Sequence, residues 1–233
     1  MTKHSSLLDT LTQRFPAAAE YLIEIFIIER DYGIVKNSVI AERLGVTKPA
    51  VTQAMNRLKK YELIQQDLYR SIQFTDLGKE LAEKLIRQHY LLELLMVKLL
   101  DYQWEKSDKE ASRLQSSISD DFANYLYTRL GQPDTCPHGN PMPGSKKEKE
   151  ILAAPRLTTA ENGDHLEVVR ITEEGEATEG LLDFCFINAI QPGTEFEVMD
   201  KERLTGITIK QPKGKTILIP HKIAKYICCT PVL

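Results

Sequence analysis

The sequence predicts an α+β fold in which a helical N-terminal half precedes a small β-barrel. Apolar residues recur at helical spacing through most of the first 130 residues. Residues 151–233 instead contain short apolar or β-branched runs that are separated by turn signals. Between the two halves, residues 133–149 hold four prolines and two glycines, which predicts a loop or linker there.

The composition is that of an ordinary globular chain. Its 233 residues suffice for one large domain or for two to three small ones, and 42% of them are hydrophobic and 27% charged. No run of about 18 apolar residues occurs, and the N-terminus has no apolar targeting segment, so we expect a cytoplasmic protein without a membrane helix. Four cysteines without a CxxC pair are too few for a disulfide framework and are typical of a reducing compartment.

Apolar periodicity and capping residues predict five helices in the N-terminal half. Gly33 and Gly45 follow the first and second helices as stop signals. Residues 63–74 predict two short strands joined by a polar turn. The helices are expected at residues 17–30, at 39–44 with Asn37 or Ser38 as the cap, from Thr47 onward with Pro49 in the first turn, from a cap at Thr75 or Asp76 to about residue 100, and at 104–130.

The C-terminal part is expected to fold mainly as strands. Turn signals at Pro192-Gly193 and at residues 212–214 separate the runs. Cys228 and Cys229 are expected to be strand residues with one side chain facing inward. The strands are expected at residues 166–171, 195–199, 206–210 and 216–219, with a short helix around residues 180–189.

Residues 35–64 carry the pattern of a helix-turn-helix that reads duplex DNA. Two short helices joined by a tight turn suit the major groove, because the second helix can meet base edges with its N-terminal residues. Between Arg43 and Lys60 the chain has five bases and no acid, whereas residues 161–202 hold twelve acids and two bases. Such a basic patch in a chain of formal net charge −3 indicates a local phosphate-binding surface. The alternative is an amphipathic helical hairpin with a solvated basic face; the strand-turn-strand and the long helix that follow favour a winged DNA-binding domain.

The third helix supplies most of the candidate DNA contacts. Gln53 can hydrogen-bond a base edge, commonly that of adenine, while Pro49 and Ala50 can contact a thymine methyl group. Arg57 and Lys60 are expected nearer the phosphate backbone. The candidate DNA-binding residues are Thr47, Lys48, Pro49, Ala50, Thr52, Gln53, Asn56, Arg57, Lys60 and, in the predicted wing, Arg70.

A family resemblance is carried by the segments "AEYLIEIFIIE", "IAERLGVTKPAVTQAMNRLKKYELI", "FTDLGKELAEKLIRQHYLLELLM", "CPHGNPMPG" and "INAIQPGTEFEVMD". In order, they resemble the first helix, the DNA-reading helices, the dimerisation region and the following loop of the diphtheria toxin repressor family, and then the SH3-like domain of the ferrous-transport-protein-A type that ends many members. The resemblance implies a winged helix-turn-helix at residues 1–75, a helical dimerisation domain at 76–145 and an SH3-like domain at 151–233.

The same resemblance implies a function. Members are homodimeric transcriptional regulators of iron or manganese homeostasis, and a divalent ion, Fe²⁺ or Mn²⁺, strengthens their binding to a palindromic DNA operator. Their DNA contacts carry over to Thr47, Pro49 and Gln53 of this chain. We therefore expect a homodimeric repressor of cytoplasmic location whose partner is double-stranded DNA and not a membrane.

The main metal site of the family departs from its pattern in this chain. The site would draw on Glu20 in the first helix and on an i, i+3, i+4 set that shares one helix face at Ser112, Gln115 and Ser116. Members have Cys or Glu, then Glu, then His at these three positions, whereas hydroxyl and amide groups are poor ligands for Fe²⁺ or Mn²⁺. The main site is therefore expected to be lost, and these ions should change operator binding by less than about tenfold, roughly 1.4 kcal/mol, unless another site senses them.

A second family site is partly kept. His89 and Glu93 stand i, i+4 on the long helix and match family ligands, and Asp108 stands where the family has a histidine. A carboxylate from the C-terminal domain, Glu176 or Glu179, could complete the set. A metal-activated repressor that uses this remodelled site is therefore the alternative to a metal-independent one. The other interpretation of His89 and Glu93 is a solvated helix pair or a buried hydrogen-bonded couple.

Two further functional classes are compatible with parts of the sequence. Cys136 and His138 could form a metal or catalytic pair, but the match of "CPHG" to the family loop favours a packing role. The sequence has no phosphate-cradling glycine loop, nucleophile elbow or HExxH motif, so we expect no enzyme. A metal-trafficking or adaptor protein acting through the SH3-like domain is the remaining alternative, and the basic stretch at residues 43–60 disfavours it.

Overall fold

The structure is a computed structural model that describes residues 14–66 and 71–232. The chain divides into two compact units. The first unit holds the residues up to His89 together with residues 115–124, and the second holds residues 90–114 together with those from Tyr125 onward. Helices α5 (Asp76–Leu94) and α7 (Asp120–Arg129) contribute residues to both units, so neither unit is a continuous stretch of sequence.

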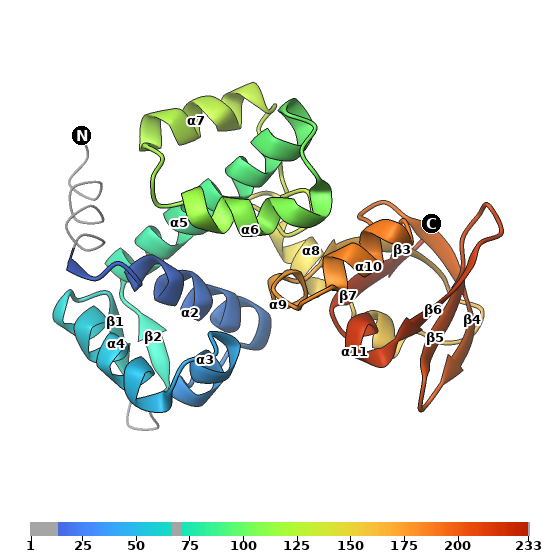
Figure 1. The fold of residues 1–233 in the computed structure, drawn as a ribbon, viewed down its shortest axis with the longest axis horizontal. Helices are drawn as coiled ribbons and strands as arrows, with labels where there is room; N and C mark the ends of the chain where they lie inside the picture. Colours follow the sequence, from blue (N-terminus) through green and yellow to red (C-terminus); the bar gives the residue numbers. More distant parts are fainter. Residues whose placement is uncertain (1–13, 67–70, 233) are drawn as a thin grey trace. The chain divides into compact units, whose positions relative to one another are not determined.

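The first three helices form close to their predicted positions (Figure 1). They are α2 (Ala18–Tyr32), α3 (Asn37–Arg43) and α4 (Lys48–Lys60). Gly33 ends α2 with a φ of +79°, as its role as a stop signal predicts. The expected cap of α3 is wrong: Lys36 stands at the N-cap, and neither Asn37 nor Ser38 caps the helix. Asn37 instead donates its side-chain amide to the Thr52 hydroxyl of α4 at 3.4 Å.

The predicted wing is a two-stranded antiparallel sheet. Its strands are β1 (Ile64–Gln66) and β2 (Ile72–Phe74). The connecting residues 67–70 lie outside the described part of the chain, and with them the candidate phosphate contact Arg70. Thr75 then caps α5, because its hydroxyl accepts a hydrogen bond from the Gly78 N–H at 3.1 Å. A Cβ at Gly78 would lie 1.8 Å from the Leu63 carbonyl oxygen, so a glycine is needed where α5 passes this close to the backbone before β1.

One apolar core joins these elements. It combines the inward faces of α2, α3, α4 and α5 with the two strands, which explains why each of these segments has a stripe of apolar residues. Fully or almost fully buried members are Leu22, Ile25, Ile28, Ile40, Met55, Leu58, Leu63, Ile72, Leu81 and Leu85.

The structure contradicts the single helix predicted at residues 104–130. Helix α6 (Trp104–Leu114) ends early, and α7 begins only after a turn of sequence QSSIS. Serine favours caps and turns over helix interiors because its hydroxyl competes for backbone groups. Ser119 shows this effect, since its Oγ accepts from the Phe122 N–H at 3.2 Å where α7 starts. The long helix reaches Leu99, as predicted, but its last turn at Leu95–Leu99 is π-helical instead of α-helical.

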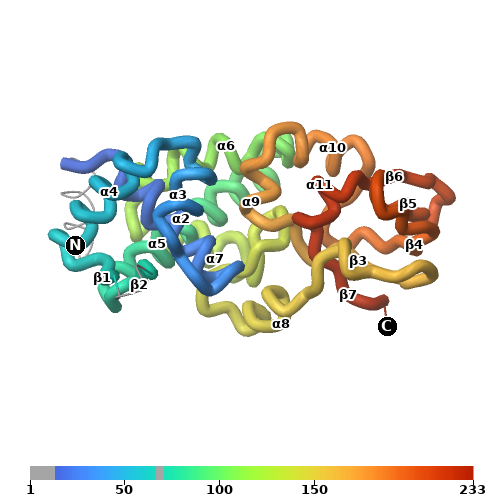
Figure 2. The backbone as a smooth tube through the Cα atoms, turned by 90° about the horizontal axis from the view of Figure 1, so that it is seen from below, coloured from blue at the N-terminus to red at the C-terminus, as the bar shows by residue number. Residues whose placement is uncertain are grey.

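The second unit contains a five-stranded antiparallel sheet in the order β6-β5-β4-β3-β7 (Figure 2). The strands are β3 (His165–Ile171), β4 (Glu195–Glu202), β5 (Gly206–Lys210), β6 (Thr216–Pro220) and β7 (Ile227–Pro231). The helical elements around it are α8 (Glu148–Ala153), a 3₁₀ turn at Leu157–Thr159, α9 (Glu173–Glu176), α10 (Leu181–Ile187) and α11 (His221–Ala224). The four predicted strands and the predicted helix near residues 180–189 are confirmed, as are the α+β class and the order of its parts.

The last strand differs from its prediction in one respect. Cys228 and Cys229 are both buried, although only one was expected to face inward. The chain before β3 pairs with the free edge of β7: the Cys229 N–H donates to the Pro155 carbonyl at 2.9 Å, and Arg156 forms a β-bridge with Cys228. All four cysteines are buried free thiols. Within residues 14–66 and 71–232, no helix is both long and apolar enough to cross a membrane.

Candidate nucleic-acid interface and metal centre

Helix α4 has one buried and one exposed face. Thr47 caps it as predicted, because its hydroxyl accepts a hydrogen bond from the Ala50 N–H at 3.3 Å. The buried face consists of Val51, Ala54, Met55 and Leu58. The exposed residues are Thr47, Lys48, Pro49, Thr52, Gln53, Asn56, Arg57 and Lys60, and Ala50 is half-buried. The candidate DNA contacts of α4 therefore lie on its solvent-facing side and at its N-terminus, which is the arrangement that a helix in a major groove requires.

The positive charge near α4 is smaller than the sequence count suggests. Arg43 forms an ion pair with Glu24 of α2, so its charge is largely neutralised. The Arg57 guanidinium lies 5.2 Å from the centre of the Phe15 ring, a cation–π contact that helps to hold the arginine side chain in place. Arg57 nevertheless remains exposed to solvent. The exposed bases of α4 are Lys48, Arg57 and Lys60.

The four positions of the family's main metal site do not present a ligand set. Ser112 is exposed on α6, and Glu20 is exposed on α2. The shared helix face predicted for the other two positions is wrong, because α6 ends at Leu114 and both Gln115 and Ser116 lie in the turn that follows. Ser116 is exposed and Gln115 is buried.

The buried Gln115 is bonded to a histidine. His89 Nδ1 and Gln115 Oε1 lie 2.8 Å apart, and both residues are less than 9% exposed. Because an amide oxygen only accepts, His89 Nδ1 carries the proton in this pair. The neighbouring Gln88 donates to the Ile118 carbonyl at 3.1 Å. Helix α5 is thus tied to the turn before α7 by direct hydrogen bonds, at a position where the family resemblance implies a metal-binding glutamate.

A cluster of potential metal ligands lies in the second unit. We call it the metal cluster; it consists of Glu93, Cys136, His138 and Glu176, all of them buried. The ligand atoms of Glu93, Cys136 and His138 lie within 4.8 Å of one another. His138 Nδ1 is 3.3 Å from Glu93 Oε1 and 3.2 Å from Glu176 Oε2. One nitrogen, one sulfur and two carboxylates from three separate segments therefore converge on a small buried volume.

The hydrogen bond of the second ring nitrogen of His138 determines which nitrogen faces the metal cluster. His138 Nε2 lies 3.1 Å from the Trp104 carbonyl oxygen, and the two rings are 4.6 Å apart between centres. A carbonyl can only accept, so Nε2 carries a proton, and Nδ1, which faces the two carboxylates, is the nitrogen that must lose its proton before a metal ion can bind. A backbone acceptor on one ring nitrogen is the usual support of a metal-binding histidine.

The loop that carries Cys136 and His138 has a tight backbone. The Cys136 N–H donates to the Asn140 carbonyl at 2.8 Å, and the Ile171 N–H donates to the His138 carbonyl at 2.9 Å. Gly139 has a φ of +89°, and a Cβ there would lie 2.2 Å from the Val169 carbonyl oxygen. Only glycine lets the loop turn this sharply and lie directly on β3. Of residues 133–149, predicted as a loop or linker, those up to Lys147 form a loop with a buried centre, and α8 begins at Glu148.

The electrostatics of the metal cluster favour a bound cation or protons. Burial raises the pKa of Glu176 to about 8, with the Glu93 carboxylate adding to the effect. Burial disfavours the charged form of His138, but the Glu176 and Glu93 carboxylates outweigh it and raise the pKa of the imidazole well above its usual value. Burial also raises the pKa of the Cys136 thiol. Two carboxylates in a dry site require compensating positive charge, which a divalent ion supplies.

The other predicted ligands take different places. Asp108 is half-buried on α6, with a carboxylate oxygen within 4.8 Å of a Glu93 oxygen. Of the two candidate carboxylates from the C-terminal domain, Glu176 joins the cluster and Glu179 is exposed. His89 lies one turn before Glu93 on α5 and is bonded to Gln115.

Cys136 and His138, for which the sequence favours a packing role, lie beside Glu93 in the fold. Their sequence did contain a signal: a cysteine and a histidine two residues apart, around a proline and before a glycine, in a chain with few of either. That signal is ambiguous without knowing that Glu93 and Glu176 lie beside them in the fold.

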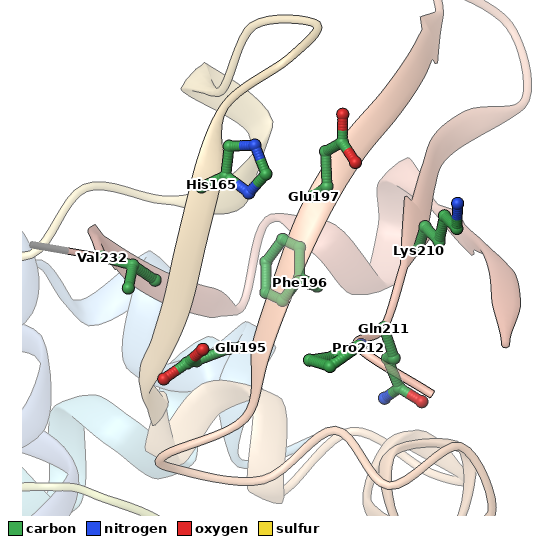
Figure 3. A pocket seen from close by; sticks show the side chains of 8 residues that line it. All are labelled: His165, Glu195, Phe196, Glu197, Lys210, Gln211, Pro212 and Val232. Atoms are coloured by element: carbon green, nitrogen blue, oxygen red, sulfur yellow. The ribbon is translucent and has the colours of Figure 1, made fainter. Parts of the chain in front are cut away.

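The sheet carries a separate pocket. It is open, has a volume of about 600 Å³ and lies over β3, β4 and β5 (Figure 3). His165 and Glu197 face each other in register across β3 and β4, and Glu197 stands opposite Lys210 of β5. The pocket shares no residue with the metal cluster, and we assign no ligand to it.

Two family models match the chain. "Iron dependent repressor, N-terminal DNA binding domain" matches residues 15–72, and "Iron dependent repressor, metal binding and dimerisation domain" matches residues 75–144. The iron-dependent repressor IdeR of Mycobacterium tuberculosis is 29% identical over 216 residues, which are 88% of this chain and 92% of the relative. The diphtheria toxin repressor of Corynebacterium jeikeium is 32% identical over 150 residues, 64% of this chain and 62% of the relative.

Solved structures resemble most of the chain. A manganese-dependent transcriptional repressor in complex with manganese has a TM-score of 0.79 and 25% identity, covering 92% of this chain and 100% of its own. The repressor ScaR with bound Zn²⁺ has a TM-score of 0.75 and 26% identity, covering 92% of this chain and 99% of its own.

Proposed function

Because the chain belongs to the iron-dependent repressor family and is a DNA-binding transcriptional repressor of the metal-dependent type, we propose that Glu93, Cys136, His138 and Glu176 hold its regulatory metal ion. The convergence of these four buried side chains is the observation that carries the proposal. Glu93 comes from α5, Cys136 and His138 from the loop after α7, and Glu176 from α9. An ion bound there would link three segments that are far apart in sequence.

The donor set favours particular ions. A thiolate and an imidazole suit Fe²⁺ and Zn²⁺, whereas Mn²⁺ prefers sites made of oxygen ligands. The two carboxylates supply the negative charge that Fe²⁺ or Mn²⁺ needs, and Asp108 lies close enough to Glu93 to add to it. We therefore propose Fe²⁺ as the ion that fits best. Zn²⁺ should compete with it, and Mn²⁺ should bind more weakly than either.

The positions of the family's main site have another role in this proposal. In place of a metal ligand, Gln115 forms a direct hydrogen bond to His89. This bond joins α5 to the turn between α6 and α7 without an ion. Ser112, Ser116 and Glu20 are exposed and belong to no ligand cluster among the described residues. We therefore favour a repressor that responds to metal through a remodelled second site over a repressor that is independent of metal.

The DNA and the dimer complete the proposal. The exposed face of α4 reads operator DNA, with Gln53 on the bases and Lys48 and Lys60 on phosphates. The homodimer forms through the segment that matches the metal-binding and dimerisation domain, where large apolar side chains are exposed. Acting on DNA places the protein in the cytoplasm, and since its relatives are named as repressors we propose no enzymatic activity.

The test compares the two metal sites directly. Operator duplexes selected from random DNA are titrated with wild type, His138→Ala, Gln115→Ala and the exposed-site control Ser112→Ala, with chelator or with Fe²⁺, Mn²⁺ or Zn²⁺. We expect the ion to strengthen DNA binding of wild type by at least about tenfold. His138→Ala should lose this gain, whereas Gln115→Ala and Ser112→Ala should keep it. A gain that disappears with Gln115→Ala and survives His138→Ala would contradict the proposal.

A further inference from the structure

Asn140 is a fully buried amide that touches the metal cluster without being one of its ligands. Its Nδ2 donates two hydrogen bonds, one to the Ile171 carbonyl at 2.7 Å and one to Glu176 Oε1. Its Oδ1 accepts a bond from Arg170 Nη1 at 3.0 Å. Three of the four hydrogen bonds that an asparagine side chain can make are therefore formed in a place without solvent.

These bonds determine which oxygen of Glu176 faces the cluster. Oε1 is bonded to Asn140, while Oε2 lies 3.2 Å from His138 Nδ1. A carboxylate on a short helix such as α9 could otherwise rotate about its last bond and present either oxygen. The Asn140 amide removes this freedom, because it occupies one oxygen and leaves the other directed at the cluster.

The orientation of the Asn140 amide is itself fixed. The guanidinium of Arg170 can only donate, so it must face the amide oxygen and thereby turns the NH₂ group toward Glu176. Arg170 Nη1 also lies 4.0 Å from Glu173 Oε2, and the Tyr90 hydroxyl donates to Glu173 Oε1. Tyr90, Arg170 and Glu173 are buried, so the amide is held by an ordered chain of polar groups and not by solvent.

We propose that Asn140 is a positioning residue for the regulatory metal: it holds Glu176 with Oε2 ready to bind the ion. This inference rests on the proposed function, because it assumes that Glu176 is a ligand. Partners of this kind typically change metal affinity by about 10–100-fold when they are removed, because the ligand must then be ordered by the ion itself. Asn140 also bonds the Ile171 carbonyl, so the test must separate an effect on Glu176 from a general loss of structure.

A double-mutant cycle makes this separation. Zn²⁺ affinity of the full chain is measured by competition with a chromophoric chelator for wild type, Asn140→Ala, Glu176→Ala and the double variant. Asn162→Ala, at an exposed asparagine, is the matched control. We expect Asn140→Ala to weaken Zn²⁺ binding by about 10–100-fold in the wild-type background. In the Glu176→Ala background the same change should have an effect of at most about twofold, because the group on which it acts is gone.

Co²⁺ spectra and a milder variant complete the test. Asn140→Ala should shift the Co²⁺ ligand-field bands while the sulfur-to-metal band from Cys136 is kept. If Asn140→Ala fails to fold, Asn140→Ser provides the same comparison, because serine is polar but too short to hold the Glu176 carboxylate. An equal loss of affinity in both backgrounds, or no loss in either, would overturn the inference.

The two proposals fail in different ways. If Glu176→Ala leaves Zn²⁺ affinity unchanged while His138→Ala abolishes it, a metal site at His138 stands without Glu176 as a ligand, and the role of Asn140 is refuted. If His138→Ala also leaves the affinity unchanged, the proposed metal centre and the inference that rests on it are both refuted.

Discussion

Burial sets the protonation of the individual residues in the metal cluster. Burial raises the pKa of the Glu176 carboxyl to about 8, with His138 opposing the effect and the Glu93 carboxylate adding to it. The Glu176 and Glu93 carboxylates raise the pKa of His138 despite its burial, and burial raises that of the Cys136 thiol. All three groups bind a metal ion only in their deprotonated form, so protons and the ion compete for the same atoms.

Metal binding should therefore release protons. At pH 7 we expect at least one proton per Zn²⁺ bound, and we expect affinity to rise with pH between 6 and 8, by about tenfold per pH unit for each proton released. The sign follows from the raised pKa values, since lowering the pH fills the sites that the ion must empty. Calorimetry in buffers of different ionisation enthalpy measures the number directly. Binding without proton release at pH 7 would contradict this picture of the cluster.

At the scale of single residues, the sequence singles out the helical members of the proposed metal cluster more readily than those in a loop. Glu93 could be proposed because it stands i, i+4 from His89 and matches a ligand position of the resembled family, whereas Cys136 and His138 follow no period that defines a face. Their contact with Glu93 spans more than 40 positions of sequence and depends on the turn that Gly139 permits. The family resemblance and the residue types predict that the main site is lost, but they do not predict the bond between Gln115 and His89.

Among the elements, α4 shows most clearly one face that packs in the core and another that carries candidate functional residues. Its buried face anchors it to the first unit, and its capped N-terminus and exposed side hold the candidate DNA contacts. The alternation of apolar and polar residues at helical spacing specifies this division, which explains why both the helix and its exposed contacts could be predicted from sequence.

Two kinds of contact on α4 should behave differently. Gln53→Ala should cost about 1–3 kcal/mol at the preferred operator and relax base preference at one or two positions, because it removes a base contact. Lys60→Ala should weaken all sequences about equally and reduce the salt slope by about one, because it removes a phosphate contact. Binding titrations at several salt concentrations on operator and mutated operator measure both effects. Lys213→Ala, in the exposed turn between β5 and β6, is the control. If Gln53→Ala changes neither affinity nor base preference, another element reads the bases.

Element ends were predicted least well where local and helical signals compete. Residues 104–130 have helical periodicity, yet the serines of the QSSIS turn break the helix after Leu114. The same competition moved the start of α3, because Asn37 bonds Thr52 of the next helix and not the backbone of its own. Such interruptions depend on which hydrogen-bond partners the side chains have in the folded protein, and a single sequence does not specify these partners.

For the whole molecule, composition predicted the order of parts but not how residues 133–149 are used. Proline and glycine are frequent in linkers, and they are equally frequent where backbones must turn tightly and approach closely. Here the second role applies, since His138, Gly139 and Asn140 are buried within the second unit. The division into domains at residues 1–75, 76–145 and 151–233 stays a proposal, because α5 and α7 contribute to both compact units.

The assembly of the whole molecule should be a symmetric dimer. Leu100 is 65% exposed and Tyr125 is 61% exposed, within the segment that matches the dimerisation domain, and large apolar side chains left in water favour association. We expect light scattering to give about twice the chain mass of 26.5 kDa at micromolar concentration.

The operator should be an imperfect palindrome with half-sites about one helical turn apart, because a two-fold dimer presents two copies of α4. Leu100→Lys should shift the protein toward monomer and weaken operator binding, whereas Leu204→Lys, at a residue that is 94% exposed in the turn between β4 and β5, should leave both unchanged. A wild-type monomer that binds a single half-site would contradict the dimer.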